Sequence, residues 1–425
     1  MWATASVVGV VIASSAQTLT WIGTMGGAES KALALSADGR VLVGYIANNA
    51  GIRRALVWRE GQGFQILPDL WDGSIARGVS ADGGVIVGAT TDENGFKRAF
   101  RLGANGLAEL GTLGGGSSIA TAVSFSGAVI VGGAQNGSGF WRAFRWTQAT
   151  GMQELGTFGG AESYAYAVSA NGSVVVGKAH SEIGEWRAFR WQIAGRMEDL
   201  GTLGGTWAEA YGVSADGEVV VGWAEHPDGF MGAFRWTATE GMRDLGTLGG
   251  AQSKALAVSS DGSIVVGWSD TPTGKRRAFR WTPHRGMEDL NVVYASLLAD
   301  GSELLEARAI TPDGRYIAGW GYNAATGLLE AFLLETEGTN HTTDPMPRSL
   351  QVRVKGSGGE ISIVSPLSPP LRVEVLDLCG RLVAHYGPQS AGDMTFYILS
   401  LPTGLYFVRI FLGTQVVVEP VVVVN

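Results

Sequence analysis

The sequence predicts an all-β fold, a seven-bladed β-propeller closed by its N-terminal strand and followed by a small β-sandwich. Three observations lead to this prediction. Glycine accounts for 64 of the 425 residues, which suits many short strands joined by tight turns. One unit of about 44 residues occurs seven times. Each unit holds four short apolar runs, the number of strands in a propeller blade.

The repeat is marked by a turn of the type Ala-Asp-Gly and by the tripeptide Arg-Ala-Phe or a variant of it. Asp-Gly between alternating apolar runs predicts a hairpin, so each unit reads as four antiparallel strands, A to D. A sheet this small cannot bury both faces alone, and neighbouring units must stack. The turn glycines follow at steps of 44 or 45 residues, with a last step of 52: Gly39, Gly83, Gly127, Gly172, Gly217, Gly262 and Gly314.

The strand count predicts how the ring closes. No strand D follows the seventh tripeptide at Ala331, but an equivalent run stands at the other end of the chain, in residues 19–27. We therefore expect residues 17–337 to form one ring in which Trp21 faces Leu333. An open stack of sheets is the alternative, and it would leave unpaired edges at both ends. The first six units have their strand-D leucines at Leu67, Leu110, Leu155, Leu200, Leu245 and Leu290.

Five units carry an arginine and an acidic residue that we expect to face each other across the C–D hairpin. Such pairs stabilise a hairpin modestly, and their repetition favours a structural role over a catalytic one. In the first unit Val57 and Ile66 hold the two positions. The expected pairs are Arg101 with Glu109, Arg145 with Glu154, Arg190 with Asp199, Arg235 with Asp244, and Arg280 with Asp289.

Composition excludes several classes of function. The net charge of -8 argues against a nucleic-acid-binding protein, which needs a basic face. Cys379 is the only cysteine and the five histidines lack ligand spacing, so we expect no disulfide, metal or cofactor. Acidic loop residues are read as solvated surface because they match no known Ca²⁺ loop: Asp92, Glu93, Glu225, Asp228 and Asp270.

Both ends of the chain have their own character. Residues 1–16 hold a short apolar run followed by small residues, which predicts a secretory signal peptide, with a buried first strand as the alternative. The run is too short to span a bilayer. Residues 338–347 are a polar, proline-bearing linker. Residues 348–425 contain short runs of alternating apolar and polar residues, which predict the strands of a small β-sandwich.

The motifs GMxDLGTLGG, AVSADG, VVVG and RAFRW, in fixed order over about residues 18–337, resemble the HAF-repeat family of bacterial extracellular proteins. The resemblance implies a secreted repeat protein without an assigned ligand or activity. Arginine stands where the family has histidine, at Arg98, Arg142, Arg187 and Arg277. The tail resembles the C-terminal sorting domain of the type IX secretion system in residues 375–381 and 401–408, which implies export to the surface of a Gram-negative bacterium.

No nucleophile elbow, P-loop, zinc-peptidase or EF-hand motif occurs. Candidate ligand-binding residues are therefore sought where the units differ, at two positions of strand A and in the D–A loop, which we place at the mouth of the ring. Aromatic and charged side chains together suit a glycan or a peptide. The alternative is that they only fill the axis. The candidates are Lys31, Trp71, Arg77, Tyr164, Tyr166, Trp207, Glu209, Tyr211, Lys254, Glu306 and Arg308.

Taken together, we expect a secreted or cell-surface repeat protein that is not an enzyme and acts as a binding or interaction module. Its partners would be a glycan, peptide or protein ligand and, through residues 348–425, the secretion machinery, with no nucleic acid and no membrane span. One alternative is a glycan-degrading enzyme that uses the carboxylates of Glu209 and Glu306. A purely structural surface protein without any ligand is the other.

Overall fold

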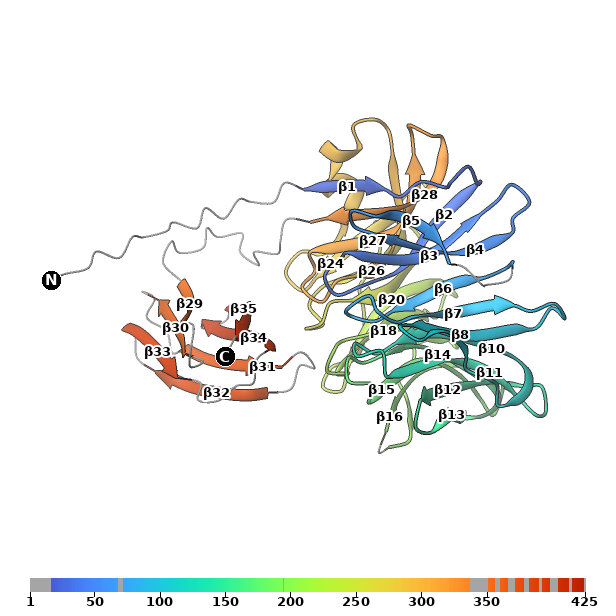
Figure 1. Ribbon diagram of the computed structural model, residues 1–425, viewed down its shortest axis with the longest axis horizontal. Coiled ribbons are helices and arrows are strands. Elements are labelled where there is room, and N and C mark those ends of the chain that lie inside the picture. The colour runs from blue at the N-terminus through green and yellow to red at the C-terminus, as the bar shows by residue number, and fades with distance from the viewer. Residues whose placement is uncertain are drawn as a thin grey trace.

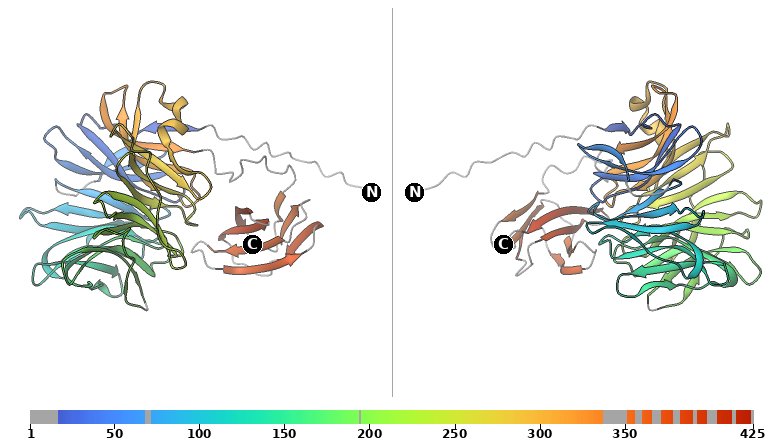
Figure 2. Two further views of the ribbon diagram at one scale, coloured as in Figure 1. Left: turned by 180° about the vertical axis from the view of Figure 1, so that it is seen from behind. Right: turned by 45° about the vertical axis from the view of Figure 1, so that its right-hand side comes forward.

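The structure, a computed structural model, describes residues 17–67, 72–193 and 195–336, and beyond them the strands of the tail within residues 351–423. The expected signal peptide, the expected linker and Trp71 lie outside these residues. Strands dominate throughout, and the sheets of residues 18–335 follow one another in chain order, from blue through green to orange (Figure 1). Turned views show the same succession (Figure 2).

One sheet contains both ends of the repeat region. Its strand order is β26-β27-β28-β2-β3-β4-β5, with β1 paired to β28, so that residues from the start and the end of the region share one sheet. The bounds are β1 (Thr18–Trp21), β2 (Glu29–Leu35), β3 (Val41–Ala47), β4 (Arg53–Arg59), β5 (Gly63–Ile66), β26 (Glu303–Ile310), β27 (Tyr316–Asn323) and β28 (Leu328–Glu335).

Within the described residues from 72 to 289, the chain forms five further sheets, each of four strands in consecutive order. The first two are β6 (Ile75–Val79), β7 (Ile86–Thr91), β8 (Lys97–Gly103) and β9 (Gly106–Glu109), then β10 (Gly114–Val123), β11 (Val129–Asn136), β12 (Trp141–Thr147) and β13 (Gly151–Glu154). The third is β14 (Gly159–Val168), β15 (Val174–Ser181), β16 (Trp186–Gln192) and β17 (Met197–Asp199). The last two are β18 (Ala208–Val213), β19 (Val219–Glu225), β20 (Met231–Thr237) and β21 (Gly241–Asp244), then β22 (Ser253–Val258), β23 (Val265–Asp270), β24 (Arg276–Thr282) and β25 (Gly286–Asp289).

The Asp-Gly hairpins form as expected, and they also join the sheets. In the first turn the hydroxyl of Ser36 donates to Asp38 and accepts from the amide of Val41, while Gly39 adopts a φ of 76°. The amide of Ala37 donates to the carbonyl of Ala81 in the next sheet at 3.0 Å. The same bond recurs in five further turns and ends at Pro312, which has no amide hydrogen to donate.

Apolar cores lie between successive sheets. The phenylalanine of the repeated tripeptide is fully buried at each of its six occurrences in the described region: Phe100, Phe144, Phe189, Phe234, Phe279 and Phe332. Six clusters of buried residues draw on two sheets each, as expected for units that cannot bury both faces alone. One cluster joins the two ends of the repeat region, packing Ile22 and Leu333 against Ala32 and Leu42.

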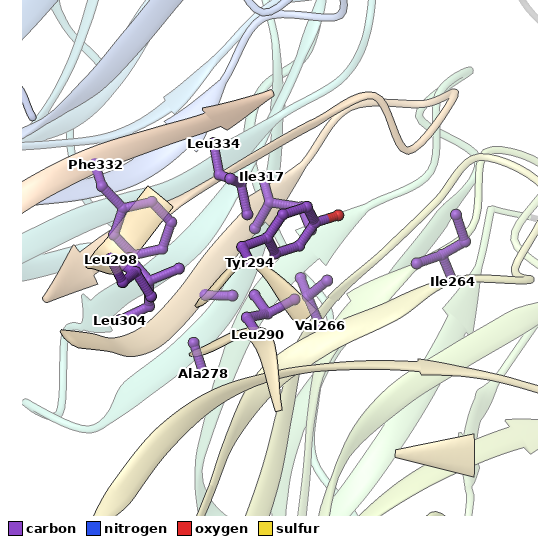
Figure 3. Packing of buried hydrophobic residues seen from close by; sticks show 11 residues of the cluster. Ile264, Val266, Ala278, Leu290, Tyr294, Leu298, Leu304, Ile317, Phe332 and Leu334 are labelled. Carbon is purple, nitrogen blue, oxygen red and sulfur yellow. The ribbon is translucent and has the colours of Figure 1, made fainter. Parts of the chain in front are cut away.

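The long step before the last unit folds into one enlarged connection. It contains α1 (Leu290–Val293) and the 3₁₀ turn Ala295–Leu298. Leu290, Tyr294 and Leu298 turn inward and pack with Phe332 and other buried residues (Figure 3). The expected loop therefore extends the core between β22–β25 and β26–β28. Among the described residues no helix has the length and apolar character to cross a membrane.

The expected arginine–acid pairs and the expected Trp21–Leu333 pair are wrong by one residue. Trp21 lies opposite Phe332, and Thr20 lies opposite Leu333. Phe144, not Arg145, faces Glu154, and the same offset occurs in every C–D hairpin of the described region, including that of Val57 and Ile66. A shift of one residue moves a side chain to the other face of its sheet.

On that other face the arginine serves a different purpose. The Nε of Arg145 donates to the carbonyl of Gly172, the turn glycine of the next sheet, at 3.1 Å. Arg190 and Arg235 make the same bond to Gly217 and Gly262. The register is set by the turn of the C–D hairpin, and in these three units the arginine ties one sheet to the next.

In the tail, two sheets are described. One has the order β29-β30-β33 and the other β32-β31-β34-β35. The strands are β29 (Gln351–Lys355), β30 (Glu360–Ser365), β31 (Leu371–Leu376), β32 (Leu382–Gln389), β33 (Gly392–Tyr397), β34 (Gly404–Leu412) and β35 (Gln415–Val423).

Candidate functional site

The candidate residues of strand A lie on strands that contact one another around one axis. We call β2, β6, β10, β14, β18, β22 and β26 the inner strands. Each contacts the next in chain order, and β26 contacts β2. Side chains from separate units can therefore meet at the axis.

A β-bulge occurs at the same place in every inner strand, and four of the candidate residues occupy it. In β6 the pairing skips Arg77, between Ala76 and Gly78, and in β18 it skips Tyr211. The skipped residues in the other inner strands are Leu33, Thr121, Tyr166, Leu256 and Arg308. Bulges re-aim side chains and often lie beside functional sites.

The glycine of the VVVG motif is what allows the bulge. At Gly222 a Cβ would lie 2.0 Å from the carbonyl oxygen of Glu209, and at Gly177 it would lie 1.9 Å from that of Tyr164. The five equivalent glycines of the other units meet the inner strand equally closely. No side chain fits at that distance, so the bulge in the inner strand requires a glycine at this position of the opposite strand.

We call the residues brought together at the axis the axial cluster: Arg77, Tyr166, Glu209, Tyr211, Lys254, Glu306 and Arg308. At its centre the rings of Tyr166 and Tyr211 stack with centroids 4.7 Å apart and planes 3° apart. The hydroxyl of Tyr211 donates to Glu209. Burial raises the pKa of both phenols, and the nearby Glu209 charge raises it further, so both remain protonated donors.

Each acidic member of the cluster is neutralised by basic partners. Glu209 is buried and lies 2.9 Å from the Nζ of Lys178. Burial alone would raise its pKa, but Lys178 and the Tyr211 hydroxyl bring the pKa below its ordinary value. Glu306 is also buried, with Arg308 at 2.8 Å and Arg276 at 3.4 Å from its two oxygens. The Glu209 carboxylate is therefore held as an ionised group, and the Glu306 carboxylate lies between two guanidinium groups.

Two basic members have no such carboxylate partner in the part of the chain that the structure describes. The Nζ of Lys254 lies 4.0 Å above the ring of Tyr211 and 5.8 Å from that of Trp223. Burial lowers the pKa of Lys254 to about 8. Arg77 makes no ion pair among these residues, and its Nε is buried without a hydrogen-bond partner. Burial and the charge of Arg308 lower the pKa of Arg77.

Outward from the axis, cations and aromatic rings alternate on the neighbouring strands. Lys31 forms an ion pair with Glu29, and its Nζ lies 4.1 Å above the ring of Trp320 on β27. Arg276 lies 3.8 Å above the ring of Trp268. Tyr164 stacks on Trp141 at 5.7 Å between centroids.

These outer contacts involve residues that sequence reasoning missed. They follow the VVVG glycine or begin strand C: Tyr45, Trp141, Lys178, Trp186, Trp223, Trp268, Arg276 and Trp320. A signal was available, because the residue after that glycine varies from unit to unit as the strand-A candidates do. It lies directly opposite them, as Lys254 lies opposite Trp268.

Trp207 is not part of the axial cluster. Its side chain is 49% exposed, and its backbone amide donates to Glu225. The histidine, cysteine and carboxylate side chains that the structure describes form no group of three suited to a metal ion.

One solved structure with a similar fold supports the interpretation of the repeat region. The propeller domain of the trilobed protease from Pyrococcus furiosus, described as having an open velcro topology, matches with a TM-score of 0.50 and 12% identity over 75% of this chain and 100% of that chain. The repeat region is a β-propeller. At this level of identity the likeness concerns the fold of the propeller only.

Two further solved structures match this chain with lower TM-scores. TolB from Acinetobacter baumannii matches at 0.42 and 12% identity, over 71% of this chain and 82% of that chain. The BP39L lectin from Burkholderia pseudomallei matches at 0.46 and 8% identity, over 74% and 97%. No family model and no curated protein matches the sequence.

Proposed function

We propose that the propeller has seven blades and is closed by β1. The eight-stranded sheet divides into two blades of four strands, because β28 and β2 share only one parallel bridge, Glu29 with Leu329. The blade β26-β27-β28 is then completed by β1. The unbroken circuit of inner-strand contacts and the apolar cluster around Ile22 and Leu333 support this arrangement.

We further propose that the protein is a secreted or cell-surface binding module that is not an enzyme. One observation carries this proposal: the bulged position, which the fold uses in every blade, holds unlike side chains that converge as an aromatic and charged cluster. A scaffold needs only a small or apolar residue there, such as Leu33, Thr121 or Leu256. Two stacked tyrosines beside buried charges suit recognition of a polar ligand.

The arrangement of the carboxylates speaks against the glycan-degrading alternative. A general acid needs a raised pKa, but the pKa of Glu209 is lowered. Glu306 is held by two arginines. We therefore assign both residues the task of holding the basic side chains of the cluster in place.

Export is proposed to depend on residues 348–425, which we take to form a β-sandwich that serves as a sorting domain. The two described sheets of the tail and the resemblance of its motifs support this. Mass spectrometry of the culture supernatant tests it. Mature protein lacking residues 1–16 is expected outside the cell, whereas retention of the full chain inside would contradict it.

Binding is tested by incubating the full chain with glycan and peptide arrays, beside Lys254→Ala and Trp207→Ala. We expect the parent and Trp207→Ala to bind the same spots and Lys254→Ala to lose them. If Trp207→Ala loses binding and Lys254→Ala keeps it, the binding site lies in the D–A loop instead. If the parent binds nothing, the structural alternative gains and the binding proposal fails.

A further inference from the structure

The axial cluster has more positive than negative charge, although the whole chain has a net charge of -8. Its two carboxylates are already occupied, Glu209 by Lys178 and Glu306 by Arg276 and Arg308. The charges of Arg77 and Lys254 remain without a carboxylate partner in the region described. Both residues are half-buried, and an unpaired charge withdrawn from water is costly, so this excess needs a reason.

Arg77 is the clearest case. Its blade folds on the same bulge as blades with Leu33 or Thr121 at this position, so the fold itself does not require an arginine. Its Nε is fully buried without an acceptor. Burial lowers the pKa of Arg77, and the neighbouring charges of Arg308 and Arg53 act in the same direction. A guanidinium held in this way offers unused donors in the fixed geometry that suits an oxyanion.

Lys254 faces the same region from another blade. The tyrosine and tryptophan rings beneath it hold the ammonium group, and none of the described carboxylates binds its three donors directly. Arg308 lies close enough to Lys254, as to Arg77, to lower the pKa of both. Arg308 on β26 therefore lies within charge range of one cation on β6 and of another on β22.

We infer that the axial cluster binds an oxyanion group of its ligand, a carboxylate, sulfate or phosphate, through Arg77 and Lys254 with Arg308 nearby. This inference deepens the proposed binding function and rests on it. The anion would give the guanidinium of Arg77 a partner of opposite charge and would offset the repulsion that Arg308 exerts on Arg77 and on Lys254. Tyr166 and Tyr211, both protonated, would flank the anion with an aromatic surface.

The test is isothermal titration calorimetry of the full chain at pH 7 and constant ionic strength. The probes are sodium glucuronate, sodium sulfate and sodium phosphate, with glucose as the neutral counterpart of glucuronate. We expect at least one of the three anions to bind. Added glucose should not weaken that binding. Binding of glucuronate alone would indicate a uronic acid, and binding of the inorganic anions a sulfate or phosphate group.

Arg77→Leu is expected to weaken this binding by about tenfold or more, as for loss of a charge-assisted hydrogen bond. Arg243→Leu, at an exposed arginine, is the matched control and should bind like the parent. Without ligand, Arg77→Leu should unfold at the parent's temperature or above it, because an unpaired buried charge is removed. Lys254→Met supplies an independent variant if Arg77→Leu does not fold.

The inference is overturned if no anionic probe binds the parent, or if the probes bind Arg77→Leu and Lys254→Met as tightly as the parent. Array binding of neutral glycans or peptides without anion binding would leave the proposed function standing and remove only the inference. Absence of both array and anion binding would remove both.

Discussion

The hydroxyl of Ser30 accepts a hydrogen bond at 2.9 Å from the backbone amide of Ala331, 301 residues later in the chain. The same bond joins neighbouring sheets elsewhere, as between Ser118 and the amide of Ala99 at 3.0 Å. If the propeller is closed, the two hydrogen bonds are equivalent, because each joins neighbouring blades and gives a buried amide its serine acceptor.

We therefore expect Ser30→Ala and Ser118→Ala to lower the free energy of unfolding by similar amounts, about 1–3 kcal/mol each, because a buried amide loses its acceptor. Urea denaturation followed by circular dichroism measures both. A loss for Ser118→Ala with none for Ser30→Ala would mean that the joint between the two ends is open in solution.

Gly133 leaves room for the stacked rings of Trp141 and Tyr164. A Cβ there would lie 2.9 Å from Tyr164 and 3.3 Å from Trp141, whereas a Cβ at Gly137 would meet nothing within 4 Å. Gly133→Ala should cost about 1–3 kcal/mol by overpacking and change the near-ultraviolet circular dichroism of the rings. Gly137→Ala is the control and should stay within about 0.5 kcal/mol. Equal, small effects would show that the rings do not pack as described.

Lys254 makes stability depend on pH. Its pKa is about 8 in the folded protein, against an ordinary 10.5, so the unfolded chain binds more protons between these values and stability rises with pH. Glu209, Glu306, Arg308 and Lys178 surround it. Between pH 8 and 9.5 the parent should gain about 1–2 kcal/mol relative to Lys254→Met.

The pH range over which stability rises ends there, because Tyr166 and Tyr211 change the free energy of unfolding in the opposite direction. Burial raises the pKa of Tyr166 and Tyr211, so stability falls once these phenols ionise in the unfolded chain, above about pH 10. Urea denaturation of parent and Lys254→Met across the window checks the prediction. A parallel rise in both proteins would show that Lys254 is not buried in its charged form.

Glu209 and Lys178 should be strongly coupled. Lys178→Met leaves the buried Glu209 with the Tyr211 hydroxyl but without its lysine, and Glu209→Gln leaves Lys178 without its carboxylate. Each variant is therefore expected to destabilise by about 2–4 kcal/mol. The double variant should lose less than the sum, with a coupling of about 1–3 kcal/mol. Additive losses in a double-mutant cycle would place the two charges apart.

Period and strand order were predictable from the sequence because the repeat states them seven times. The pairing of the N-terminal strand with the last strand followed from counting strands, since Ala331 has no strand D after it. The register did not follow. The charge pattern placed Arg145 opposite Glu154, whereas the arginine instead binds the carbonyl of Gly172 in the next sheet, a contact that no pattern within one hairpin contains.

The axial cluster was predictable in part. The varying residues of strand A, among them Tyr166 and Glu209, do meet. The bulge that re-aims Tyr166 has no local sequence mark other than the glycine on the opposite strand. Lys178 was missed because it lies on strand B and reaches Glu209 across a boundary between blades. Trp207 was included because it is aromatic and near in sequence, yet it points into solvent.

The central claim is that the two ends of the repeat region pair and so bring the inner strands around one axis. A disulfide tests it most directly, since Thr20 lies opposite Leu333 and paired positions of an antiparallel ladder are within reach of a cystine. The variant Thr20→Cys/Leu333→Cys, with Cys379→Ser, is oxidised, digested and analysed by mass spectrometry. We expect a peptide pair that links residues 20 and 333 within one monomer. Free thiols, or links only between monomers, would contradict the closed ring and the axial cluster with it.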